Sequence, residues 1–116
     1  MDIKKHLINT LKVDSILNLT GDKKVHFIHA NNPIPPYVEY MVISENGDEF
    51  SEGKETYTKY LIQVDIFSLG NYSELEKQIK SVMINAGYCR DQSADLYEEK
   101  TKLYHKAMRF NISLPF

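Results

Sequence analysis

The sequence predicts an α+β domain in which an antiparallel or mixed β-sheet of about five strands carries two helices on one face. Two observations lead to this prediction: residues 57–68 place apolar side chains on both alternating faces of a strand, and residues 73–87 repeat them at helical spacing. The length of 116 residues, with 42% apolar and 26% charged side chains, fits a single globular domain over residues 1–116. The expected order is helix, three strands, helix, two strands.

The first part of the chain predicts one helix and two strands. Apolar residues recur at helical spacing over residues 3–11, behind Asp2, which can cap the helix. The β-branched and aromatic run at 25–29 predicts a short strand. The stretch PIPPYVEY, at 33–40, holds three prolines, which can precede a strand but cannot sit inside a sheet ladder. We therefore expect a stiff, extended lead-in to a second strand.

The segment 57–68 is expected to be the central strand, because both of its faces carry apolar groups. One face would hold Tyr60, Ile62, Val64 and Ile66, and the other Leu61, Gln63, Asp65 and Phe67.

The second helix is predicted with both ends marked. Ser73 and Glu76 have the spacing of a capping box, and Gly87 stands where a helix C-cap is expected. Its apolar stripe comprises Leu75, Ile79, Val82, Met83 and Ala86. The remaining residues predict a hairpin with a polar tip, whose last strand alternates between apolar and polar positions.

Composition argues against several functional classes. The formal net charge of −2 is unlike that of domains that neutralise phosphates with clustered basic residues. Cys89 is the only cysteine, so no intrachain disulfide can form and a reducing, cytosolic site of synthesis is expected. No apolar run approaches the roughly 20 residues that span a bilayer, and the amino end lacks the pattern of a signal peptide, so no membrane partner is expected.

The sequence offers no catalytic, cofactor-binding or metal-binding site. His26 and His29 are three residues apart on a predicted strand, so their side chains point to opposite faces and cannot chelate one ion. No cofactor-binding or nucleophile motif is present, and a lone thiol is usually a packing residue. A small α+β enzyme or ligand-binding domain that uses His29, Cys89 or His105 is the least favoured alternative.

Two segments are candidate interaction sites. A long polar loop is predicted at 45–56, and loops of this length often bind partners. Its candidate residues are Glu45, Asp48, Glu49, Phe50, Glu52, Lys54 and Glu55. Tyrosine is enriched at protein interfaces, and the eight tyrosines gather at strands and strand ends. The candidate interface at a strand edge comprises Pro35, Pro36, Tyr37 and Tyr57.

The order of these segments resembles the tail terminator proteins of long-tailed bacteriophages and prophages, also called tail completion or head–tail joining proteins. The resemblance covers nearly the whole chain. It rests on the short strand VHFIHA, the proline lead-in and strand PIPPYVEYMVIS, the polar loop, the strand-to-helix segment YLIQVDIFSLGNYSELEKQIKSVM and the closing hairpin.

The resemblance implies a structural virion protein, made in the host cytoplasm and located at the head-proximal end of the tail. Relatives form a ring, usually of six copies, that ends the tail tube and presents a docking face to the head connector. The implied partners are further copies of the chain, the tail tube protein and the head–tail connector or stopper protein. Double-stranded DNA would pass through without specific binding, and no cofactor is implied.

One hypothesis places the acidic loop at 45–56 against the lumen or the tail tube protein, because acidic walls repel phosphates. The nearest alternative is another phage neck protein, such as a head completion or stopper protein.

Overall fold

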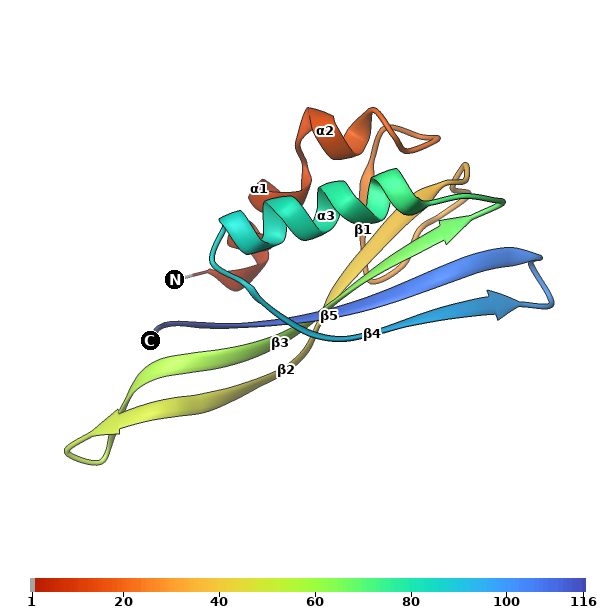
Figure 1. Cartoon of the computed structure of the whole chain (residues 1–116). Helices are drawn as coiled ribbons and strands as arrows, with labels where there is room; N and C mark the ends of the chain where they lie inside the picture. The colour runs from red at the N-terminus through yellow and green to blue at the C-terminus, as the bar shows by residue number, and fades with distance from the viewer. Residues whose placement is uncertain (1) are drawn as a thin grey trace.

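The computed structural model describes residues 2–116, in which three helices cover one face of a five-stranded sheet (Figure 1). The helices are α1 (Ile3–Leu11), α2 (Asp14–Leu17) and α3 (Ser73–Asn85). The strands are β1 (Val25–Phe27), β2 (Tyr37–Ser51), β3 (Lys54–Ser68), β4 (Cys89–Glu98) and β5 (Leu103–Pro115). The predicted α+β class is confirmed, and α2 adds a third, short helix.

The sheet has the order β1-β2-β3-β5-β4, so β3 is central as predicted. β1 pairs in parallel with β2, whereas the other neighbours are antiparallel. None of the helices within residues 2–116 is both long and apolar enough to cross a bilayer.

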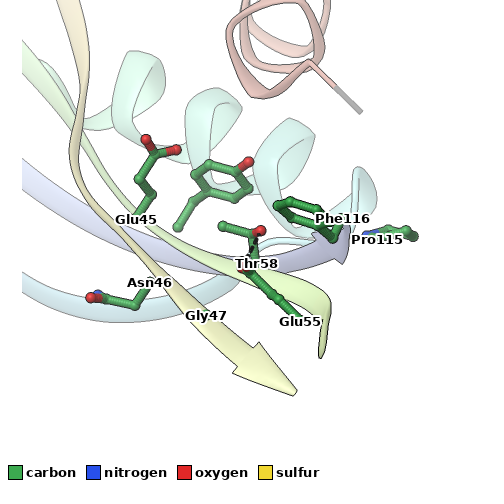
Figure 2. A pocket seen from close by; sticks show the side chains of 8 residues that line it. Glu45, Asn46, Gly47, Glu55, Thr58, Pro115 and Phe116 are labelled. Atoms are coloured by element: carbon green, nitrogen blue, oxygen red, sulfur yellow. Dashed lines mark hydrogen bonds between the residues drawn. The ribbon is translucent and has the colours of Figure 1, made fainter. Parts of the chain in front are cut away.

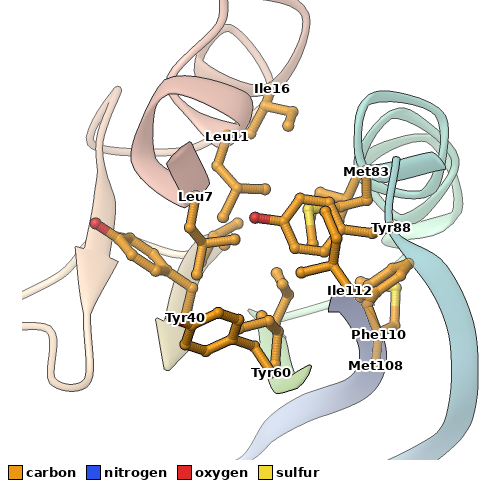
Figure 3. Packing of buried hydrophobic residues seen from close by; sticks show 14 of the residues in the cluster. Leu7, Leu11, Ile16, Tyr40, Tyr60, Met83, Tyr88, Met108, Phe110 and Ile112 are labelled. Atoms are coloured by element: carbon orange, nitrogen blue, oxygen red, sulfur yellow. The ribbon is translucent and has the colours of Figure 1, made fainter. Parts of the chain in front are cut away.

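The core lies between the helices and the inner face of the sheet (Figure 3). Alternation along β3 buries Tyr60, Ile62, Val64 and Ile66 under the helices, as the sequence predicted. The helices contribute Leu7, Leu11, Ile16, Leu75, Ile79 and Met83 to the same cluster. The strand β5 adds Met108, Phe110 and Ile112, so the three central strands and all three helices share one core.

Both ends of α1 and α3 are fixed by local hydrogen bonds. The Asp2 carboxylate accepts from the backbone N–H groups of Lys4 and Lys5, which confirms the predicted cap. The predicted capping box at Ser73 is wrong, because α3 begins at Ser73 itself and its N-cap, Tyr72, has no side-chain cap bond. The side-chain oxygen of Asn71, two residues before Ser73, accepts from the Ser73 N–H. The C-cap of α3 is Ala86, one residue before the predicted Gly87, and Gly87 follows it with a positive φ of 102°, as is usual for a glycine that ends a helix.

A buried lysine joins α3 to the β4–β5 hairpin. Lys106, which is 8% exposed, lies 3.4 Å from the Glu76 carboxylate and 3.2 Å from that of Asp95. Burial raises the pKa of Glu76, but the hydrogen bond from Lys80 and the charge of Lys106 outweigh it, so the net shift is downward. Hydrogen bonds from Tyr72 and then Lys106 lower the pKa of Asp95. The same bond to Asp95 raises the pKa of Tyr72 to about 12.

We expect acid to weaken the fold through this cluster. A carboxylate whose pKa is lower in the folded state stabilises the protein above its unfolded pKa of about 4, and the stabilisation disappears as the pH falls through the folded pKa. Lys106→Met removes the cation that Glu76 and Asp95 share, so the unfolding free energy should fall less between about pH 5 and pH 2 than in the wild type. Urea denaturation at several pH values measures this, with Lys100→Met in the exposed hairpin tip as the matched control. Parallel pH curves for wild type and Lys106→Met would contradict the assignment.

Candidate interaction surfaces

The outer face of the sheet carries no helix (Figure 1). A line of stacked rings crosses it: Tyr37 lies 4.8 Å from Phe67, and Phe67 lies 4.3 Å from His105, measured between ring centroids. These residues belong to β2, β3 and β5 and lie directly opposite one another, because Tyr37 pairs with Phe67 and Phe67 pairs with His105. Burial, followed by the charges of Glu39 and Glu98, raises the pKa of Tyr37.

A chain of hydrogen bonds runs beside these rings. The buried Asp65 carboxylate lies 2.7 Å from Nε2 of His105 and accepts from the Gln63 amide at 2.9 Å. The Arg109 Nε–H donates in turn to the Gln63 carbonyl oxygen at 3.1 Å. Polar side chains on this face are therefore held in place by one another.

A shallow hollow of about 640 Å³ opens on the same face, between β3, β5 and β4. Its lining includes Gln63, Ala94, Leu96, His105, Ala107 and Arg109. Leu96 is 49% exposed, and Arg109 forms no ion pair with a carboxylate of residues 2–116. Alternation along the two strands predicted that Gln63 shares a face with Asp65, and that His105 shares a face with Arg109, but the sequence did not show that β5 lies between β3 and β4.

The prediction of a loop at 45–56 is wrong, because the strands β2 and β3 continue through these residues and form a hairpin. Only Glu52 and Gly53, both with positive φ, form the turn, which is the geometry of a two-residue hairpin turn. Residues 45–56 have the composition of a loop, but pairing between β2 and β3 keeps them extended. We call residues 45–56 the arm. Figure 1 shows it projecting away from the helices.

A pocket of about 430 Å³ lies at the base of the arm (Figure 2). It is lined by Glu45, Glu55, Thr58, Tyr60, Pro115 and Phe116, among others. The Thr58 hydroxyl donates to the Glu55 carboxylate at 2.7 Å. The carboxylates of Glu45 and Glu55 lie near the exposed ring of Phe116 and make this pocket acidic, and its open shape gives no enclosed site for a small substrate.

The other candidate interaction residues are distributed differently from the prediction. Tyr57 lies in β3 between β2 and β5, and Tyr37 lies in β2, which has β1 on its outer side, so neither is on an edge strand. The segment with Pro35 and Pro36 leads directly into β2 as expected, but it is not extended as predicted, because the Pro35–Pro36 peptide bond is cis and both residues lie in a bend. The sheet edge that sequence reasoning missed is β4, a ten-residue strand that is exposed almost throughout and pairs only with β5.

The structure separates the groups considered for chemistry. Cys89 pairs with Asn111, six positions along β5 from His105, which is a separation of about 20 Å. His29 follows β1, at the opposite edge of the sheet from β4. Among residues 2–116, no three His, Cys, Asp or Glu side chains are arranged to hold a metal ion.

Comparison with solved structures finds a chain of similar fold in a virion. A chain in the virion of a native gene transfer agent particle matches 98% of this chain, and the match covers 95% of that chain, with a TM-score of 0.65. The two chains share one fold. Their sequences are 10% identical, and no protein-family model and no curated protein matches the sequence.

The gene transfer agent chain supports the fold over its whole length. Because the match covers nearly all of both chains, it includes the helical layer, the sheet and the β2–β3 hairpin together. At 10% identity the likeness concerns architecture alone.

Proposed function

We propose that the protein is a structural component of a phage-like virion and acts as a tail terminator, forming a ring that ends the tail tube and joins it to the head connector. The observation that carries this proposal is the near-complete match to a chain of a gene transfer agent virion. The sequence resemblance to tail terminators supports the finer assignment independently, because it rests on the order of segments and not on the fold comparison.

The surfaces of the domain suit a ring. Rings arise when one patch of a subunit meets a different patch of the next copy. Here the arm projects at one end of the sheet, whereas the outer hollow and the unpaired edge of β4 lie on the body. A sixfold ring with these contacts would leave other faces for the tail tube protein and the connector.

The arm also suits a channel for DNA. It carries five carboxylates and one lysine, so its formal charge is −4. An acidic wall repels phosphates and lets a duplex pass without specific binding. The wide separation of Cys89, His105 and His29 supports a structural role instead of a catalytic one.

We expect the purified protein to bind one end of preformed tail tubes and to close there into rings of about six copies, the number implied by the resemblance.

Replacing Asp48, Glu49 and Glu52 with lysine should impair tail joining or DNA ejection, because it turns a surface that repels phosphates into one that attracts them. Electron microscopy of tails and an infectivity assay measure both effects. A variant with lysine at Asp14, Glu74 and Glu99, all exposed and outside the arm, makes the same charge change as a control.

Two outcomes would redirect the proposal. Binding to filled heads and not to tails would identify a stopper protein of the neck. Binding to neither heads nor tails would overturn the virion role at this position.

A further inference from the structure

Charge is unevenly divided between the arm and the rest of the chain. The arm has a formal charge of −4, whereas the whole chain has −2, so the remaining residues sum to +2. Two arms therefore repel each other, and an arm is attracted to the body of another copy.

The tip of the arm bears an exposed aromatic side chain. Phe50 is 62% exposed, and its ring lies over Gly47, where an added Cβ would be 2.6 Å from the ring. Pairing of β3 with β5 ends at Tyr57, so Phe50 and Glu55 pair beyond the third strand. A two-stranded hairpin is marginally stable in water, so contact with a partner would stabilise this tip.

The hollow on the outer face offers complementary groups. Leu96, Ala94 and Ala107 give it apolar surface, and Arg109 supplies a cation with no carboxylate partner in residues 2–116. Planar guanidinium groups bind carboxylates with two parallel hydrogen bonds. The only buried acid beneath this surface, Asp65, already accepts hydrogen bonds from His105 and Gln63.

An arm cannot reach the hollow of its own chain. Glu55 lies eight residues along β3 from Gln63, which lines the hollow, and this is a distance of about 25 Å in an extended strand. From Tyr57 to Gln63 the strand pairs with β2 on one side and with β5 on the other. The occupant must come from another molecule.

We propose that the arm tip of one copy docks into the outer hollow of a second copy. Phe50 packs against Leu96 and Ala107, and a carboxylate near the tip, from Glu49 or Glu52, pairs with Arg109. This docking would form the contact between neighbouring subunits of the proposed ring, so the inference rests on the proposed function. The contact is heterologous, so repeating it produces a closed ring or a filament. The face of the arm that is turned away from the neighbour remains free to line a channel.

Mixing two defective variants tests the contact. Phe50→Ala combined with Glu49→Lys disables the arm, and Arg109→Glu disables the hollow. Sedimentation velocity from micromolar to millimolar protein should show that the wild type associates and that each variant alone stays monomeric. An equimolar mixture should form one-to-one dimers, because each pair retains one intact arm and one intact hollow. High salt should weaken this association. Phe116→Ala and Lys77→Glu change an exposed phenylalanine and an exposed lysine elsewhere and should leave association unchanged.

Three results would overturn the docking. Association of both variants at wild-type strength would place the interface elsewhere. Failure of the mixture to dimerise would exclude this pairing of surfaces. A wild type that stays monomeric at millimolar concentration, and in a tandem fusion that raises the effective concentration, would show that the arm has no affinity for a second copy. The capping of tail tubes is measured separately, so the tail terminator proposal can stand while the docking fails.

Discussion

Replacing Phe110 with alanine is expected to lower the free energy of unfolding by about 3–5 kcal/mol. The ring lies on the inner face of β5, is 1% exposed and belongs to the core shared by the helices and the central strands (Figure 3). The substitution removes the apolar surface that the ring buries and leaves a cavity that the surrounding side chains fill only in part. Urea denaturation followed by circular dichroism measures the change.

Phe116→Ala is the matched control for this prediction. Its ring is 80% exposed, so the same chemical change should alter the free energy of unfolding by no more than about 0.5 kcal/mol. Losses of similar size in the two variants would mean that Phe110 is not in a packed core.

Gly21→Ala is expected to lower the free energy of unfolding by about 1–3 kcal/mol, the usual range for forcing extra atoms into a packed site. An added Cβ at Gly21 would collide with the backbone oxygen of Ile34 and lie 2.7 Å from that of Pro35. Backbone on both sides has little room to move, because the Gly21 N–H also donates to the Pro36 carbonyl at 2.8 Å. Thermal unfolding measures the loss, and hydrogen exchange should show faster opening near the start of β2.

Gly70→Ala is the control, since an added Cβ there meets no atom within 4 Å. Equal stability of the two variants would show that the lead-in to β2 is not held by Gly21. The result bears on the prolines of PIPPYVEY, because this contact fixes the direction in which the stiff lead-in delivers the chain to the sheet.

Those parts of the fold that follow from local periodicity were predictable from the sequence. The alternation in β3 specified which residues face the helices, since a strand that turned the other way would expose Ile62 and Val64 to water. The stripe of α3 was equally clear, because Leu75, Ile79 and Met83 recur at the spacing of a helix face and are all buried.

The candidate interaction surfaces depend on pairing between distant segments, and this explains why the sequence left them unresolved. The hollow needs Arg109 on β5 to lie between Gln63 on β3 and Ala94 on β4, and nothing local to any one strand specifies this order. The arm has the composition of a loop, and it is a hairpin because β2 and β3 extend each other's ladder. A sequence signal for it existed in the pair Glu52-Gly53, which suits a two-residue hairpin turn.

The way in which the arm is built allows its length to change without disturbing the body. Its turn is confined to Glu52 and Gly53, and the strands on either side are fixed only to each other near the tip. Two residues added to each strand preserve which side chains face which way and lengthen the arm by about 7 Å. One residue added to a single strand would reverse the faces or force a bulge. Insertions in matched pairs would therefore give a series of proteins with the same core and different reach.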